Sequence, residues 1–402
     1  MPTPEARKLT DFINKKELEG FDGYSILIVV DGEPNVKPIS PMFNAGRIGK
    51  LYNVDGFKGK KIAYIKNPFP EEVRLVPTVM LDSNLVSYLQ QFVEKTLHKD
   101  FYYSIFLFIK EVHVNLNYDF SPVFYFYESF HKQEVKDFKQ FALKSYMALL
   151  KIQVMDKEKF VSDYEIQEDP RLVAELCKNK MCSSLEQVAK NYIDNFADAQ
   201  QHEMSIMPNV TYLVLLKMVL IKYDRRIEDS GKIQAVYEFM IEEFGLLFAR
   251  EIVLSALYFS SRTGRSIKYF DKNINIINLK HNLQATAWDI LLARMPEMLL
   301  TFSSPDEVTV ATICTGEEFI KEICEMVSYE RIDVCKKKNF IQPQFLFNNS
   351  LMMEKLDKVY YDSIVQIIDT HVPVRTRKSL TKEYLDGLED KLLKECSFHK
   401  GC

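Results

Sequence analysis

The sequence predicts a helix-rich α/β protein in which a parallel sheet is flanked by helices. From Tyr24 to Pro70 short β-rich runs alternate with turn signals, whereas from Leu85 onward apolar residues recur at helical spacing. Between these regions, a run from Val73 to Leu81 is followed directly by a polar turn and an apolar-periodic helix. Strand, turn and helix in this order form the opening unit of a parallel α/β sheet, whose ligands bind at the carboxyl ends of the strands.

Composition limits the classes of protein that this chain can belong to. The 402 residues are 47% hydrophobic, enough to bury one large core or a few smaller ones. The 52 basic and 56 acidic residues nearly balance, so any contact with nucleic acid must rest on a local patch. Seven irregularly spaced cysteines fit free thiols and a cytoplasmic location. The longest apolar runs fall short of the ~20 residues that cross a bilayer, so we expect no membrane span.

The N-terminal region is expected to form a small β-hairpin unit. Ser25 to Val30 is a β-rich run followed by the turn signal Asp31-Gly32. Gly46 to Ile65 carries Asp55-Gly56 between alternating stretches.

Asp82 is the first candidate site residue, because it directly follows the predicted strand. In Asp82-Ser83-Asn84 it precedes the helix that contains Leu85 and Leu89. This position suits a ligand-binding carboxylate, and it equally suits a helix N-cap. One aspartate can serve as both.

Glu128 and Asp289 are two further carboxylates in apolar surroundings. Ser121 and Pro122 have the residue types of an N-cap and a first helical position, which places Glu128 in a helix of aromatic residues. Asp289 lies in a mostly buried helix from Asn282 to Leu300, and Glu297 returns to within roughly 80° of its face. The simpler alternatives are a solvated helix face or an ion pair with a lysine such as Lys132 for Glu128, and a local pair with Arg294 or another base for Asp289.

Buried carboxylates need partners, because one unpaired charge costs several kcal/mol. If Asp82, Glu128 and Asp289 converge, their repulsion calls for a cation such as Mg²⁺ or Mn²⁺, which prefers oxygen ligands.

The motif Leu81-Asp82-Ser83-Asn84-Leu85 resembles the opening motif of PIN-like nuclease domains. The stretch Asp119 to Glu128 is similar to the second acidic motif of that family, and Trp288-Asp289 to the third. The resemblance implies a PIN-like parallel sheet with catalytic and metal-binding roles for Asp82, Glu128 and Asp289. The fourth motif departs from the family, because Cys314 stands where its last aspartate falls; Glu317 or Glu318 is a substitute ligand, and Glu297 a further one.

The predicted organisation has four parts. Residues 1–72 form the N-terminal β-rich segment, 73–140 and 276–330 the PIN-like core, 141–275 a helical insertion, and 331–402 a C-terminal helical tail. The insertion suits a dimerisation or lid subdomain, so a homo-oligomer is one expectation.

Three classes of function remain open from the sequence. In the first, the resemblance implies a metal-dependent hydrolase of nucleic acid, of RNA ahead of DNA, acting as a toxin or antiviral defence effector restrained by an inhibitory protein. Basic clusters at Lys222 to Arg226, Arg262 to Arg265, Lys336 to Lys338 and Arg375 to Lys378 are then candidate phosphate contacts. In the second, the chain is a catalytically inert PIN-like interaction or regulatory module. The third is a helical scaffold in which Val73 to Leu81 is no strand.

Overall fold

The computed structural model describes most of the chain. The described residues are 24–29, 36–38, 52–55, 61–66, 74–115, 117–132, 135–200, 206–262, 276–302, 307–315, 318–335, 340–370 and 380–399. The strands are β1 (Tyr24–Val29), β2 (Val36–Pro38), β3 (Tyr52–Asp55), β4 (Lys61–Lys66), β5 (Arg74–Leu81), β6 (Asp119–Ser121), β7 (Glu307–Thr315), β8 (Val327–Cys335) and β9 (Phe340–Phe347).

Helices make up most of the remainder of the described chain. The first group is α2 (Ser83–Val93), α3 (Lys99–Ile109), the π-helix η2 (Lys110–Asn115), α4 (Val123–Lys132), α5 (Val135–Gln153), α6 (Lys157–Asp163), α7 (Pro170–Asn179) and α8 (Leu185–Gln200). The second group is α9 (Ile206–Tyr223), α10 (Asp229–Phe244), α11 (Ala249–Phe259), α12 (Ile276–Phe302), α13 (Glu318–Met326), α14 (Asn349–Lys355), α15 (Lys358–Thr370) and α16 (Lys382–His399).

A five-stranded sheet with the order β2-β3-β7-β5-β6 contains the predicted parallel unit. Strand β5 pairs in parallel with both β6 and β7, and β3 pairs antiparallel with β7. The side chains of Val79, Met80 and Leu81 are all buried, as expected for a strand in the middle of a parallel sheet. The expected strand before Asp82 is therefore confirmed, and the purely helical scaffold is wrong.

A second sheet, with the order β4-β1-β8-β9, joins the two ends of the chain. The N-terminal strands are present, but the expected hairpin is wrong for β1, which pairs antiparallel with β4 and β8, while the next strand β2 pairs with β3 in the other sheet. Strands β8 and β9 cover 327–335 and 340–347, so the expectation of a helical tail from residue 331 is wrong for its first part. Strands β8 and β9 pair antiparallel with each other, and β8 pairs in addition with β1 from the other end of the chain.

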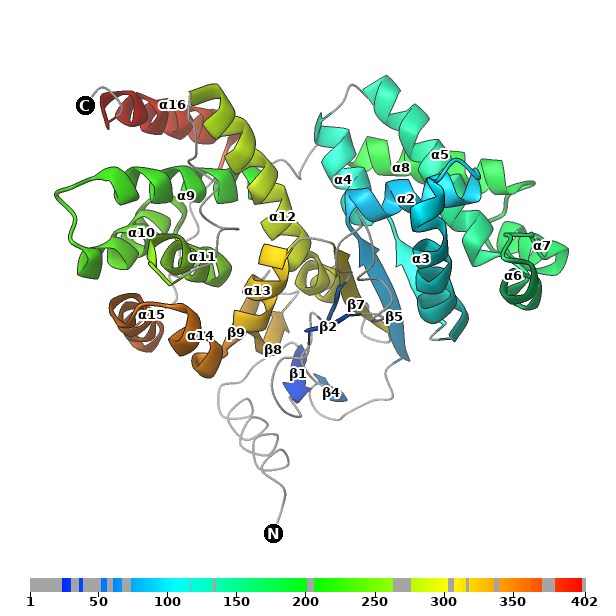
Figure 1. Cartoon of the computed structure of the whole chain (residues 1–402), viewed down its shortest axis with the longest axis horizontal. Helices are drawn as coiled ribbons and strands as arrows, with labels where there is room; N and C mark the ends of the chain where they lie inside the picture. The colour runs from blue at the N-terminus through cyan, green and yellow to red at the C-terminus, as the bar shows by residue number, and fades with distance from the viewer. Residues whose placement is uncertain are drawn as a thin grey trace, which may run out of the picture.

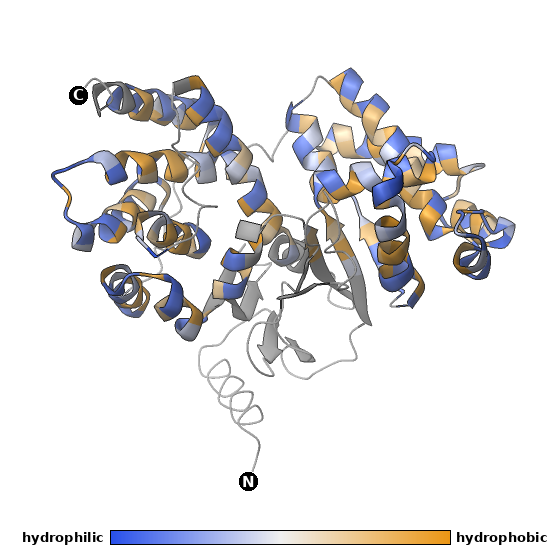
Figure 2. Ribbon diagram, viewed as in Figure 1, coloured by the Kyte–Doolittle hydropathy of each residue, from blue (hydrophilic) through white to orange (hydrophobic). Residues whose placement is uncertain are grey.

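The helices form two lobes on either side of the sheets, with α12 between them (Figure 1). Helices α2–α8 gather beside β5 and β6, and α9–α11 gather with α14–α16. The expected insertion, 141–275, is helical in its described residues, but it contributes α5–α8 to one lobe and α9–α11 to the other. In both lobes the hydrophobic residues lie where helices face one another, and hydrophilic residues lie on the outside (Figure 2).

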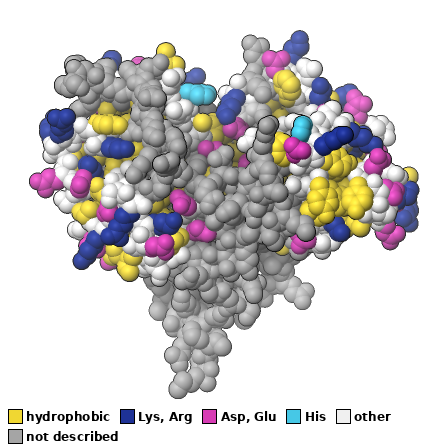
Figure 3. Space-filling model, viewed as in Figure 1, with side chains coloured by type: hydrophobic (Ala, Val, Ile, Leu, Met, Phe, Trp, Pro, Cys, Tyr) yellow, Lys and Arg dark blue, Asp and Glu magenta, His cyan; other side chains and the backbone are white. Residues whose placement is uncertain are grey.

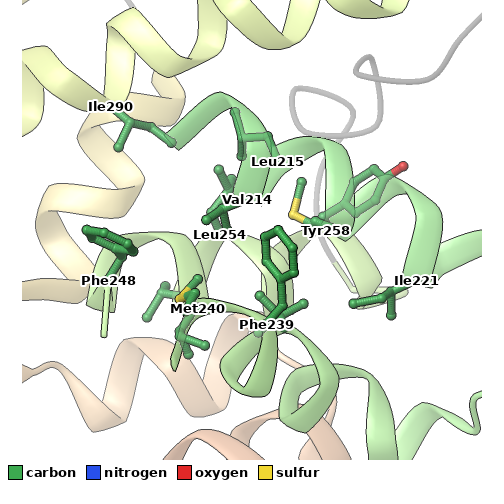
Figure 4. Close-up of a cluster of buried hydrophobic side chains, with 14 of the residues drawn as sticks. Val214, Leu215, Ile221, Phe239, Met240, Phe248, Leu254, Tyr258 and Ile290 are labelled. Carbon is green, nitrogen blue, oxygen red and sulfur yellow. The ribbon is translucent and has the colours of Figure 1, made fainter. Parts of the chain in front are cut away.

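The largest hydrophobic core lies in the lobe that contains α9–α11. Val214 and Leu215 of α9 pack with Met240, Leu254 and other buried side chains from α10, α11 and α12 (Figure 4). Helix α9 is apolar on nearly all sides, as is typical of a helix surrounded by protein. Among the described residues it is the one helix long and apolar enough to cross a membrane, with a mean hydropathy of 1.4, and 67% of it is buried inside the protein.

Candidate functional site

Asp82 lies at the carboxyl end of β5, where its backbone and side chain have separate roles. The backbone N–H of Asp82 donates to the carbonyl oxygen of Cys314, at 3.2 Å, which ties the end of β5 to the end of β7. Its side-chain Oδ1 accepts from the backbone N–H of Leu85 at 2.8 Å, so Asp82 is the N-cap of α2. The residue is 7% exposed and also lines a cavity, described below. Both interpretations of Asp82 from the sequence, cap and site residue, are therefore compatible with its position.

Glu128 reaches the same region from α4. That helix begins at Val123, because Ser121 is the last residue of β6 and pairs with Met80 instead of serving as the N-cap. Ser83 Oγ donates to one carboxylate oxygen of Glu128, and Lys132 Nζ lies 2.5 Å from the other. The predicted Glu128–Lys132 pair is confirmed, with 14% of the glutamate side chain and 50% of the lysine side chain exposed.

Asp289 lies on α12, which runs between the two lobes. The alternative that Asp289 pairs with Arg294 is wrong, since Arg294 binds Glu251 of α11 through both carboxylate oxygens. A spacing of five residues turns a helix by about 140°, so Asp289 and Arg294 face different sides of α12. Asp289 instead faces the cavity that Asp82 and Glu128 line.

One cavity of about 280 Å³ brings these three carboxylates together. It lies where β5 and β7 end, and Thr315, the last residue of β7, forms part of its wall. Its lining residues are Asp82, Ser83, Asn84, Phe124, Glu128, Ser129, Lys132, Asp289, Leu292, Thr315 and Ile320. In the space-filling view the two lobes are separated by a notch in which acidic and hydrophobic side chains meet (Figure 3). Residues more than 200 positions apart in the sequence thus contribute to one polar site.

The donor types in this cavity suit a hard divalent cation, but the carboxylates are not gathered around one point. Carboxylate, hydroxyl and amide oxygens from Asp82, Ser83, Asn84, Asp289 and Thr315 are the ligand types of Mg²⁺ and Mn²⁺. Within the described part of the chain, however, no group of three or more His, Cys, Asp or Glu side chains is placed to hold a metal ion. The positive charge beside Glu128 is the Lys132 ammonium.

The structure does not describe the side chains of the other expected carboxylate ligands, Glu297 and Glu317. Glu297 is in α12, but its side chain is not among the described ones, and Glu317 lies outside the described residues. Cys314 is fully buried at the end of β7, next to Thr315. The hydroxyl of Thr315 was not singled out from the sequence, although its place at the end of a β-rich run is the same signal that identified Asp82.

Several basic residues of these clusters have local partners. Arg226 forms an ion pair with Asp224, and Arg262 forms one with Asp357. The ammonium of Lys222 lies 3.8 Å from the centre of the Tyr258 ring. The clusters at 336–338 and 375–378, together with Arg265, lie outside the described residues.

Comparisons with known proteins do not narrow the function. No protein-family model matches the chain, and no curated protein or solved structure matches it either.

Proposed function

We propose that this chain is a PIN-like, metal-dependent nuclease that hydrolyses phosphodiester bonds, of RNA ahead of DNA, in the cavity lined by Asp82, Glu128 and Asp289. The single observation that carries the proposal is that these three carboxylate residues line one cavity at the carboxyl ends of parallel strands. Ligand sites of open α/β sheets occur at this edge. The PIN-like resemblance of the sequence motifs supports the same assignment.

A bound Mg²⁺ or Mn²⁺ would lower the pKa of an attacking water and neutralise charge on the phosphate. Asp82, fixed at the N-cap of α2, and Asp289, carried by α12, are the carboxylates that would hold the ion. Glu128 would join them when Lys132 moves away from it, a movement that the half-exposed lysine side chain permits. The released ammonium would then be available to bind a substrate phosphate.

A second candidate function is a catalytically inert PIN-like interaction or regulatory module. The observation that favours it is the neutralisation of Glu128 by Lys132 and its hydrogen bond from Ser83, together with the lack of a three-ligand group among the described residues. In this alternative the ion pair is a permanent replacement for a metal ion. The inhibitory protein partner, the homo-oligomer and the cytoplasmic location remain predictions from the sequence under either function.

Calorimetric titration with Mn²⁺ separates the two candidates. We expect the wild-type protein to bind Mn²⁺, and Asp82→Asn and Asp289→Asn each to weaken binding by about tenfold or more, because each removes a charged ligand. Asparagine is as good an N-cap as aspartate, so Asp82→Asn retains the start of α2. Asp137→Asn, which changes an exposed acid of α5 outside the cavity, is the matched control and should bind like wild type.

Cleavage assays then test the reaction. Labelled single-stranded RNA and the matched DNA are incubated with Mn²⁺ or Mg²⁺, with a chelator as the metal-free arm. Cleavage that needs the metal and is lost in both Asn variants supports the nuclease. If neither wild type nor Lys132→Met binds Mn²⁺, the nuclease proposal is overturned and the inert module becomes the better account.

A further inference from the structure

A second cavity, of about 230 Å³, lies beside β6, an edge strand of the five-stranded sheet. Its walls come from β5, η2, β6, α5 and α8, and it shares no lining residue with the carboxylate cavity. The lining residues are Thr78, His113, Asp119, Phe120, Ser121, Pro122, Tyr146, Leu149, Leu150, Gln153 and Tyr192. None of them is a lysine or an arginine.

His113, one of the lining residues, has an unsatisfied hydrogen-bond acceptor. The residue is 4% exposed, and its Nδ1 lies 3.1 Å from the carbonyl oxygen of Tyr118. A carbonyl only accepts hydrogen bonds, so Nδ1 carries the proton. Burial lowers the pKa of His113, which keeps the ring neutral and leaves Nε2 as an acceptor. Within the described residues Nε2 has no hydrogen-bond partner, an arrangement that costs about 1–3 kcal/mol unless a donor is bound.

The wall also includes the Asp119 carboxylate and two tyrosine rings. Burial is the main cause of the raised pKa of Tyr146, and the negative charge of Asp119 is a smaller cause. The electric field of Asp119 therefore reaches the phenol ring of Tyr146. The rings of Tyr146 and Tyr192 lie 4.6 Å apart between centres, and burial raises the pKa of both, so both hydroxyls stay protonated. The nearby ammonium of Lys157 is held by the carbonyl of His113 and by Asn117, and it does not line the cavity.

We propose that this cavity binds a small organic cation that carries a planar guanidinium or amidinium group. Such a group offers several N–H donors in one plane, which suits His113 Nε2 and the Asp119 carboxylate together, and its face stacks on aromatic rings such as Tyr146 and Tyr192. A phosphate would meet a carboxylate and no basic lining residue, and an apolar ligand would leave Nε2 unsatisfied. The cavity is smaller than the ~300–1,000 Å³ typical of drug-sized ligands, so the occupant is a small molecule or the end of a side chain.

The test titrates the full chain with methylguanidinium and agmatine, using calorimetry or ligand-observed NMR. Acetate is the probe of opposite charge, and a blocked arginine, acetyl-arginine methylamide, shows whether an arginine side chain of a partner also enters. We expect both small cations to bind and acetate not to bind. Binding of the blocked arginine as well would identify a protein partner as a second source of the same group.

The variants are chosen to leave the fold intact. Asp119→Asn keeps the backbone carbonyl that accepts from Thr78, and His113→Phe keeps an aromatic ring beside Phe120. Each should weaken methylguanidinium binding by about tenfold or more, the loss expected for one hydrogen bond to a charged group. Asp137→Asn is the charge-matched control and should bind like wild type. Absence of binding to the wild type up to 10 mM, or binding that survives both Asp119→Asn and His113→Phe in folded protein, would overturn the proposal.

Discussion

Two carboxylate–cation pairs in this molecule are chemically alike and differ in their surroundings. Glu251 and Arg294 lie in the core of the α9–α11 lobe, where the glutamate side chain is fully buried. Thr211 Oγ1 donates to Glu251 at 2.9 Å, and the Arg294 guanidinium lies 5.0 Å from the centre of the Phe248 ring. Glu128 and Lys132, in contrast, are one helical turn apart at the wall of an open cavity, and half of the lysine is exposed.

The difference in burial determines which of the two ion pairs can separate. Breaking a buried pair leaves a charge in the core, so the Glu251–Arg294 pair joins α11 to α12 permanently. A partly exposed pair on one helix is worth only a few tenths of a kcal/mol, so Lys132 can leave Glu128 at little cost. The Glu251–Arg294 pair fixes α12, the helix that carries Asp289. The Glu128–Lys132 pair can open, and the charge at the cavity wall then changes.

Substitution of Arg294 by methionine should have the largest effect on stability. Arg294→Met leaves Glu251 buried without its cation, and we expect a loss of about 3–5 kcal/mol in the free energy of unfolding. Urea unfolding followed by circular dichroism measures it. The double variant Glu251→Leu/Arg294→Met removes both charges and should regain most of the loss. A single variant as stable as wild type would show that the pair does not anchor α12.

Removal of the Asp82 cap at the start of α2 should have the next largest effect on stability. Asp82→Ala removes the acceptor for the Leu85 N–H, so we expect a loss of about 1 kcal/mol in the free energy of unfolding. Asp82→Asn should be nearly neutral in stability. Equal stability of the Ala and Asn variants in urea unfolding would contradict the capping role and leave the carboxylate with a site role alone.

Acid should destabilise the lobe that contains α2–α8 through the buried His113 and the half-buried His131. Burial lowers the pKa values of His113 and His131 below 6.5, so the unfolded chain binds their protons first as pH falls. The free energy of unfolding should therefore decrease as pH drops below 6.5, and level off once the folded state is protonated too. Unfolding midpoints between pH 7.5 and 5 measure this. His113→Phe should flatten part of the slope, and an unchanged slope in that variant would contradict the contribution of His113.

The smallest effect on stability is expected from Lys132→Met. The change should alter the free energy of unfolding by less than about 0.5 kcal/mol, because the pair is partly exposed. Mn²⁺ affinity should rise several-fold in the same variant, because Glu128 no longer has a competing cation. A large loss of stability would place this pair in the same class as Glu251–Arg294 and remove the basis for a movable lysine.

The sequence was most informative where a signal was local. Asp82 after a β-rich run, the helix around Asp289 and the Glu128–Lys132 pair at four-residue spacing all follow from nearest neighbours along the chain. The partner of Arg294 was missed because it lies 43 residues away, on another helix. Strand β8 was missed in part for the same reason, since its partner β1 comes from the opposite end of the chain, whereas β9 pairs with β8, its neighbour in the sequence.

The convergence of the three carboxylates was a hypothesis that the sequence supported only through the resemblance to PIN-like motifs. Their shared cavity depends on how α12 packs beside β7 and α4, which no local pattern specifies. The second cavity gave no signal at all, because a buried histidine in a run of apolar residues has the same pattern as one that is fully satisfied.

The pairing of β1 with β8 also bears on how the chain is made. Leu27 and Arg331 are register partners, so about 300 residues must be synthesised after β1 before its partner strand exists. At a ribosomal rate of roughly 5–20 residues per second, this takes about 15–60 s. One edge of the β1–β4 strand pair stays unpaired during that interval, and an open strand edge is a template for aggregation. We therefore expect the yield of folded protein to depend on chaperones that bind the nascent chain.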